Sequence, residues 1–239
     1  MQVLGKILRV LWTPQYRAAF LRTRVAASTE HDPILAGLNL NTVVDIGANR
    51  GQFALCIRRL YPQARIFSFE PMQKAAQTYL KTFEGDTQAR LFNTAIGPEA
   101  RSAQMHVARW DVASSLLPIG QGQHDNFPFS EESRRETVSV APLSAFIDSQ
   151  ALSGKSLLKL DVQGYELLAL EGCADLLDGF HYVYVEASFV ELYVGQALAS
   201  EVIAYLLGKG FRLICVANLE TGHAQRPIQA DFLFARAAP

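Results

Sequence analysis

Four acidic residues stand at the ends of short apolar segments that have the composition of buried strands: Asp45, Glu70, Asp161 and Glu186. A carboxylate accepts hydrogen bonds from ribose hydroxyls or backbone amides, and it can remove the proton of an alcohol. The carboxyl ends of parallel strands meet at one edge of a sheet, where open α/β sheets bind their ligands. We therefore expect these side chains to face one crevice.

The first of these segments, around Asp45, runs into a loop in which Gly47 and Gly51 enclose Asn49. Glycine lets the chain turn sharply and lets a ligand approach the backbone. The helix expected next, over 52–60, favours an anionic group such as a carboxylate at its N-terminus. Glu70 follows Gly51 by 19 residues, near the spacing at which an acid accepts both ribose hydroxyls. The pattern indicates half of a nucleoside-binding site.

The glycine spacing separates two nucleoside cofactors. The dinucleotide fingerprint G-x-G-x-x-G, begun at Gly47, would require glycine where the chain has Asn49 and Gln52. A wider loop with Asp45 just ahead of it suits S-adenosylmethionine, whose amino acid end would meet the loop and whose ribose would meet Glu70. An NAD(P)-dependent oxidoreductase is the less favoured alternative.

Asp161 and Glu186 are expected at neighbouring strand ends, which places two carboxylates at one cavity. Methyl transfer from a sulfonium to an alcohol needs a near-linear approach and removal of the hydroxyl proton. Either carboxylate could take that proton. The pair could also bind Mg²⁺, but it defines no third ligand, so no metal is expected. His124 is the one histidine we would test as a base.

The order of apolar and amphipathic segments predicts where these residues are held. Helix-like and strand-like segments alternate, which is typical of an α/β protein with a parallel sheet. The last two strands flank a turn-rich stretch at 218–222 and should form an antiparallel hairpin. We expect strands over 42–44, 65–69, 90–95, 156–161, 181–186, 211–217 and 230–235, and helices over 52–60, 73–83, 165–177 and 197–209.

Two segments stand apart from this alternation. Residues 1–40 should form an N-terminal helical segment that packs on or near a domain over 41–239. Its basic start and the helical spacing of Leu4, Ile7, Leu8 and Leu11 leave contact with a membrane surface or a partner open as an alternative to packing. Residues 98–136 look too irregular for one element and should form a lid-like insertion or a disordered loop.

Composition limits the remaining classes. The 239 residues are 49% hydrophobic and 19% charged, which suits one folded domain without a transmembrane span. With 22 basic and 23 acidic side chains, the net charge of −1 provides no field to hold nucleic acid. The three cysteines form no C-x-x-C motif and fit a reducing compartment, so we expect a cytoplasmic protein.

Taken together, the motifs resemble the FkbM family of S-adenosylmethionine-dependent methyltransferases. The similarity runs from about Thr42 to Phe234 and rests on five segments in order. One departure is Pro-Leu-Ser-Ala at 142–145, where the family usually carries Thr-Leu-Asp-Asp. The five segments are Asp-Ile-Gly-Ala-Asn-Arg-Gly at 45–51, Phe-Ser-Phe-Glu-Pro at 67–71, Ala-Ile-Gly at 95–97, Lys-Leu-Asp-Val-Gln-Gly-Tyr-Glu at 159–166 and Gln-Ala-Asp-Phe-Leu-Phe at 229–234.

The resemblance implies a Rossmann-like class I methyltransferase fold. Its seven-stranded, mostly parallel sheet would have strand order 3-2-1-4-5-7-6, with the seventh strand antiparallel and helices on both faces. It implies O-methylation of a hydroxyl on a sugar, glycan or secondary metabolite. A scaffold that binds the cofactor without catalysis is the non-enzymatic alternative.

The resemblance also implies roles for single residues. Asp161 corresponds to the acid that faces the reactive methyl group. Asn93 or Thr94, at the end of the third strand, could contact the adenine, and Ser115 lies in a stretch that would close over the substrate. The cofactor positions are Asp45, Gly47, Asn49, Gly51 and Glu70.

Overall fold

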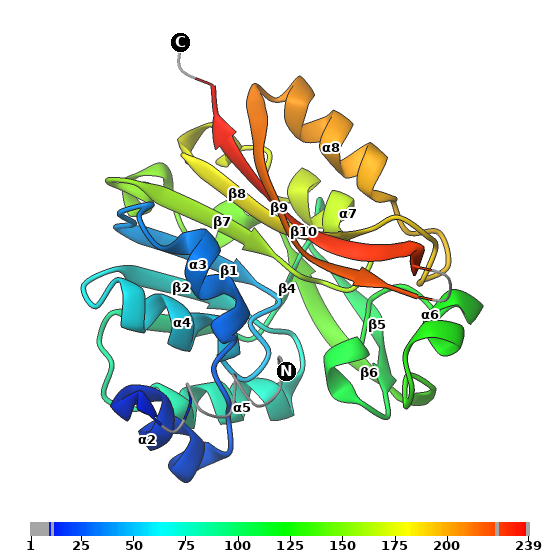
Figure 1. Cartoon of the computed structure of the whole chain (residues 1–239), viewed down its shortest axis with the longest axis horizontal. Helices are drawn as coiled ribbons and strands as arrows, with labels where there is room; N and C mark the ends of the chain where they lie inside the picture. Colours follow the sequence, from blue (N-terminus) through cyan, green and yellow to red (C-terminus); the bar gives the residue numbers. More distant parts are fainter. Residues whose placement is uncertain (1–9, 11, 223–224, 238–239) are drawn as a thin grey trace.

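A computed structural model of the chain describes residues 10, 12–222 and 225–237. Its centre is a seven-stranded sheet in the order β3-β2-β1-β7-β8-β10-β9 (Figure 1). Numbered along the chain within this sheet, the order is 3-2-1-4-5-7-6, and β10 alone runs antiparallel to its neighbours, which confirms the expected fold. The strands are β1 (Thr42–Ile46), β2 (Arg65–Phe69), β3 (Ala89–Phe92), β7 (Ser156–Leu160), β8 (Tyr182–Ser188), β9 (Phe211–Thr221) and β10 (Pro227–Arg236).

Alternating side chains along the strands build a core on each face of the sheet. Val43 and Leu157 pack on one face, under α4 and α5, whereas Val44 and Leu158 pack on the other, under α7 and α8. The helices therefore cover both faces, as expected. Their bounds are α4 (Gln52–Leu60), α5 (Gln73–Thr82), α7 (Glu166–Glu171) and α8 (Ala199–Gly208).

The N-terminal segment packs on the α4 side of the sheet, where it is dark blue in Figure 1. It holds α2 (Pro14–Thr23), the 3₁₀ turn η1 (Thr29–His31) and α3 (Asp32–Leu35). Val25, Ala27 and Leu35 are buried in the same core as α4. The spacing of Leu4, Ile7, Leu8 and Leu11 lies outside the described residues.

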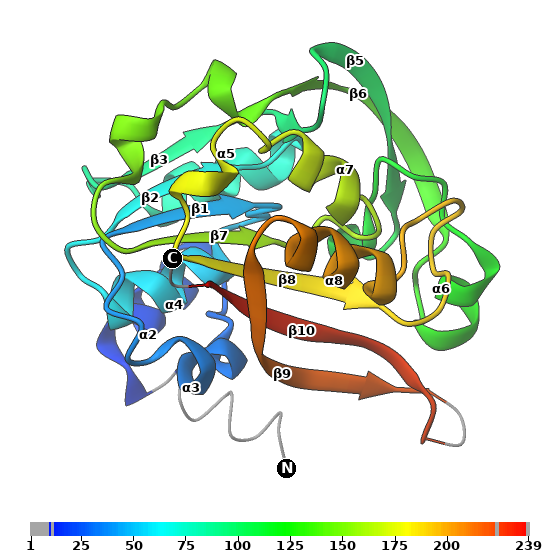
Figure 2. The same cartoon turned by 90° about the horizontal axis from the view of Figure 1, so that it is seen from above.

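The alternative of a disordered loop over 98–136 is wrong, because the segment folds into strands of a second sheet and a helix, whereas its lid-like role stays a prediction. The sheet has the order β4-β6-β5, and Figure 2 shows β5 and β6 beyond the ends of the parallel strands. Met105, Val107 and Val138 bury their side chains against Met72 and Ala75. Polar residues interrupt the alternation of apolar side chains along β5 and β6, so the sequence did not indicate these two strands. The elements are β4 (Ala95–Ile96), β5 (Arg101–Ala108), η2 (Asp111–Ala113), α6 (Gln121–Asn126) and β6 (Glu132–Ala141).

Other expected elements differ in their limits. The third strand stops at Phe92, and 95–96 belong to the second sheet. The helix expected to reach residue 177 ends at Glu171, and the next residue, Gly172, packs so closely on Gly97 that a Cβ would lie 2.5 Å from that backbone. The final hairpin is confirmed, but β9 continues through 218–221, the stretch expected to be a turn.

No helix in the described part of the chain is long and apolar enough to cross a membrane.

Candidate active site

Two adjoining cavities lie at the carboxyl ends of the parallel strands. The first, of about 220 Å³, is lined by the loop after β1 and is named here the glycine-loop cavity. The second, of about 180 Å³, is named the acidic cavity because its lining includes Glu30, Asp161, Glu186, Glu220 and Asp231. Both are lined by Ser28, His31, Lys159 and Asp161, which mark the boundary between them.

A buried ion pair joins the two central strands below this boundary. Asp45 and Lys159 are partners in the register of β1 and β7, and Lys159 Nζ lies 3.0 Å from Asp45 Oδ1. The ammonium also donates to the carbonyl of Gly47 at 3.0 Å. Burial alone would lower the pKa of Lys159, but Asp45 and Asp161 raise it above its ordinary value. Lys159 is therefore a fixed positive charge under the loop.

Gly47 is required where the loop leaves β1. Its φ is +79°, and a Cβ there would lie 1.9 Å from the carbonyl oxygen of Asp161. Only glycine allows this approach of two backbones at a positive φ. Gly51 has φ +94° and caps α4, where a Cβ would lie 2.5 Å from the ring of Phe83.

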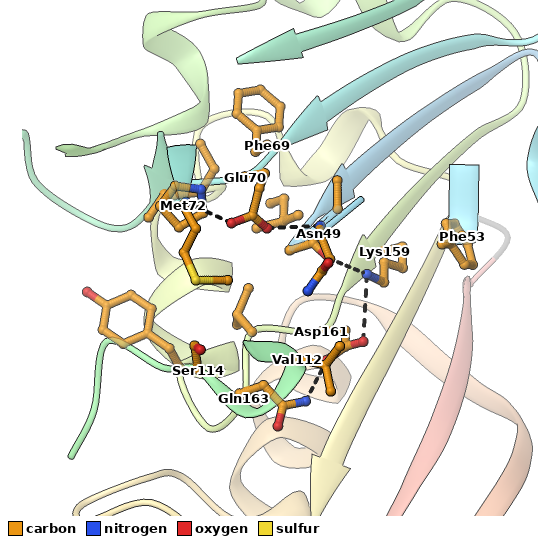
Figure 3. Close-up of a pocket in the computed structure, with 18 of the residues that line it drawn as sticks. Asn49, Phe53, Phe69, Glu70, Met72, Val112, Ser114, Lys159, Asp161 and Gln163 are labelled. Atoms are coloured by element: carbon orange, nitrogen blue, oxygen red, sulfur yellow. Dashed lines mark hydrogen bonds and ion pairs between the residues drawn. The ribbon is translucent and has the colours of Figure 1, made fainter. Parts of the chain in front are cut away.

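Glu70 stands at the end of β2 and points into the glycine-loop cavity (Figure 3). Its Oε2 accepts from the backbone N–H of Asn49 at 2.9 Å, and its Oε1 accepts from that of Met72 at 2.8 Å. A carboxylate has about four lone-pair sites, so about two remain for a ligand. Burial raises the pKa of Glu70 to about 7, although the two N–H groups oppose the shift.

Asp161 and Glu186 are brought together by one amide. The Nε2 of Gln163 donates to Asp161 Oδ1 at 2.9 Å and to Glu186 Oε2 at 3.1 Å. The Oε1 of Gln163 accepts from the hydroxyl of Tyr193 at 2.7 Å, which fixes the orientation of the amide. Burial and the charges of Asp161 and Asp231 raise the pKa of Glu186 well above its ordinary value. The expected pair of carboxylates therefore exists, but Glu186 lines only the acidic cavity.

Five predicted site residues line neither cavity. Two of them, Asp45 and Gly51, are buried beneath the loop, and the other three lie elsewhere. Asn93 does not line either cavity, because its amide donates to the carbonyls of Glu70 and Pro71. Ser115 is buried, and its hydroxyl donates to the carbonyl of Gln163 at 2.6 Å, so it anchors the insertion instead of facing a ligand. His124 lies on α6 and pairs with Ser130, outside both cavities.

Sequence reasoning missed Lys159, Gln163 and His31 as site residues. A lysine inside Leu-Leu-Lys-Leu was a usable signal, because a charge in a strand covered on both faces needs a buried partner. Gln163 carried a weaker signal beside Asp161. His31 carried none, since it reaches the cavities from the N-terminal segment.

The departure at 142–145 does not affect the cavities. Leu143 is buried in the core on the α7 side, and neither cavity is lined by residues 142–145. Among the residues that the structure describes, no group of three or more His, Cys, Asp or Glu side chains is arranged to hold a metal ion.

The glycine-loop cavity fits S-adenosylmethionine on two observations. Glu70 keeps about two lone-pair sites for a ligand, and the Oδ1 of Asn49 is buried without a hydrogen-bond partner within the described ranges. A ligand with amino and hydroxyl donors would satisfy Asn49 and Glu70 together. The fold and this site are those of a class I methyltransferase.

Comparisons with known proteins agree with this class. The model of the methyltransferase FkbM domain matches residues 45–213, and the chain therefore belongs to this family of S-adenosylmethionine-dependent methyltransferases. The chain is 29% identical over 167 residues to the 2-O-methyltransferase NoeI of Sinorhizobium fredii, covering 64% of this chain and 66% of that protein. It is 28% identical over 208 residues to methyltransferase sdnD of Sordaria araneosa, covering 77% and 78%.

Solved structures support only the fold, because their sequence identity to this chain is 10%. Sp1610 of Streptococcus pneumoniae, solved with S-adenosyl-L-methionine, has a TM-score of 0.52 at 10% identity, covering 89% of this chain and 74% of that one. The fibrillarin pre-rRNA processing protein of Methanococcus jannaschii has a TM-score of 0.50 at 10% identity, covering 95% and 78%.

The ionisation of Glu70 should control cofactor affinity. Ribose hydroxyls donate hydrogen bonds, so they favour the carboxylate over the acid, and affinity should rise with pH until Glu70 is ionised near pH 7. We expect S-adenosylhomocysteine to bind about tenfold more weakly at pH 6 than at pH 8 by titration calorimetry. Glu70→Gln should bind weakly at both values. A wild-type affinity that does not change with pH would contradict this role.

Removal of the charge on Lys159 should destabilise the protein through Asp45. Lys159→Met leaves a buried, unpaired carboxylate, which costs about 3–5 kcal/mol of the free energy of unfolding. The double variant Lys159→Met/Asp45→Asn should recover much of this loss, because no charge is then left unpaired. Urea denaturation measures the free energy of unfolding of the single and the double variant. A single variant within about 1 kcal/mol of wild type would show that the pair is not a structural constraint.

Proposed function

We propose that the protein transfers a methyl group from S-adenosylmethionine to a hydroxyl of a sugar, glycan or secondary-metabolite acceptor. The observation that carries this proposal is the position of Asp161, which lines both cavities at their boundary. Its side chain is 40% exposed, and Oδ2 lies 3.9 Å from Lys159 Nζ. A carboxylate at this boundary can meet a cofactor on one side and an acceptor on the other.

Each cavity would hold one reactant. In the glycine-loop cavity, Glu70 would bind the ribose, and the loop at Gly47 and Asn49 would bind the amino acid end. S-adenosylmethionine, when bound, supplies a methyl group on a positively charged sulfur. Asp161 would accept a hydrogen bond from the acceptor hydroxyl and so orient its oxygen toward that methyl group.

The acidic cavity suits an acceptor rich in hydroxyl groups. Carboxylates accept hydrogen bonds without donating any, which matches the hydroxyl donors of a sugar. Glu30, Asp161 and Asp231 line the cavity and supply such acceptors, whereas Glu186, whose raised pKa favours the acid, can also donate. The name of NoeI, a 2-O-methyltransferase, supports oxygen as the methylated atom.

Replacement of Asp161 should separate catalysis from cofactor binding. Asp161→Asn keeps the shape of the side chain but removes the charge that orients the hydroxyl, so we expect kcat to fall by about 10²-fold. The Kd for S-adenosylhomocysteine should stay within about threefold, because Glu70 and the loop remain. The assay follows labelled methyl from S-adenosylmethionine onto a panel of methyl hexosides, nucleotide sugars and glycans, with the product identified by mass spectrometry and NMR.

Glu171→Gln serves as the matched control, because Glu171 is exposed at the end of α7 and lines neither cavity. This variant should turn over like the wild type. Methyl transfer to nitrogen or carbon instead of oxygen would contradict the proposed reaction type. Cofactor binding without transfer to any acceptor in the panel would favour a scaffold without catalysis.

A further inference from the structure

His31 reaches the boundary between the two cavities from η1, outside the region that matches the family model. Its side chain is 16% exposed. The ring packs edge-on against Phe53, with centroids 5.3 Å apart, and against Tyr184, with centroids 5.5 Å apart. His31 is therefore held on two sides and open on the side of the cavities.

The hydrogen bonds around Asp231 determine which nitrogen of His31 carries a proton. The hydroxyl of Tyr184 and the amide of Asn218 both lie 2.7 Å from Asp231 Oδ2 and donate to it. Burial would raise the pKa of Asp231, but the bonds from His31, Asn218 and Tyr184 lower it below its ordinary value. Asp231 is thus ionised and accepts a hydrogen bond from the Tyr184 hydroxyl.

The tautomer of His31 follows from this arrangement. His31 Nδ1 lies 2.9 Å from the hydroxyl oxygen of Tyr184 and 3.4 Å from Asp231 Oδ2. Since the Tyr184 proton points to Asp231, Nδ1–H must be the donor to Tyr184. The lone pair is then on Nε2, for which no hydrogen-bond partner appears in the described part of the chain. A neutral imidazole held in one tautomer by a carboxylate is the arrangement of a general base.

We propose that His31 Nε2 takes the proton of the acceptor hydroxyl, with Tyr184 and Asp231 as positioning residues; this inference rests on the proposed O-methyl transfer. The hydroxyl proton moves to Nε2 while the oxygen forms a bond to the methyl carbon. The carbon–sulfur bond breaks, and its electron pair stays on sulfur. One positive charge disappears from sulfur and one appears on the imidazolium.

The charges around the boundary favour this step. Asp231 on β10, Glu30 on η1 and Asp161 in the loop after β7 stabilise an imidazolium, whereas Lys159 is already paired with Asp45. Asp161 differs from His31 because its carboxylate already accepts from Gln163 and faces the ammonium of Lys159. Asp161 therefore orients the hydroxyl, and His31 removes its proton. Glu186 on β8 and Glu220 on β9 also line the cavity, but their raised pKa values weaken their contribution.

A first test needs no substrate. In ¹⁵N NMR of the wild-type protein, we expect the neutral His31 ring to carry its proton on Nδ1, with Nε2 unprotonated. Asp231→Asn should change this tautomer balance, because the carboxylate no longer orients the pair. A neutral ring protonated at Nε2 in the wild type would overturn the proposal.

A second test measures turnover with the acceptor panel. The amide nitrogen of asparagine approximates Nδ1, so His31→Asn keeps a donor to Tyr184 but removes the base. We expect kcat to fall about 10²–10⁴-fold, with the Tm and the Kd for S-adenosylhomocysteine nearly unchanged. The ionisation that limits kcat at low pH should disappear in this variant and persist in Asp161→Asn. Added imidazoles should rescue His31→Ala in proportion to their basicity, which a structural role would not produce.

The outcomes also distinguish this inference from the proposed function. Oxygen methylation by the wild type, with His31→Asn within threefold of it, would leave the function intact and overturn the role of His31. Absence of transfer to any hydroxyl in the wild type would overturn the function, and the role of His31 as a base with it.

Discussion

The arrangement of the site depends on the ion pair between Lys159 and Asp45. Two charges in a strand core are tolerated only as a pair, because each alone would lose its hydration without compensation. The pair lies directly across the register of β1 and β7, and the same ammonium holds the carbonyl of Gly47. It therefore fixes the glycine loop against the end of β7, where Asp161 begins the next loop.

The segments that line the two cavities are arranged around this ion pair. The loop after β7 presents Asp161 and Gln163, and Glu166 holds that loop by accepting the N–H groups of Val162 and Gly164. The insertion is anchored to it through Ser115, and its turn η2 lines the glycine-loop cavity. The N-terminal segment supplies His31 from the other side. Segments far apart in sequence thus enclose one reaction site.

Much of this could be predicted from the sequence, because the parallel sheet forces strand ends to one edge. Glu70 and Asp161 face the glycine-loop cavity as expected, since strand periodicity and glycine spacing determine where they emerge. Asn93 and His124 were misplaced because local hydrogen bonds hold their side chains elsewhere. His31 could not be predicted as a site residue, because its position depends on contacts with β8 and β10 and not on any local sequence pattern.

The most direct test of the account is a crystal structure of the protein with S-adenosylhomocysteine bound. We expect its ribose hydroxyls on Glu70, its amino acid end at the loop of Gly47 and Asn49, and its sulfur at the boundary beside Asp161 and His31, facing the acidic cavity. Binding outside the glycine-loop cavity, or a sulfur that faces away from the acidic cavity, would contradict the assignment of one cavity to the cofactor and the other to the acceptor.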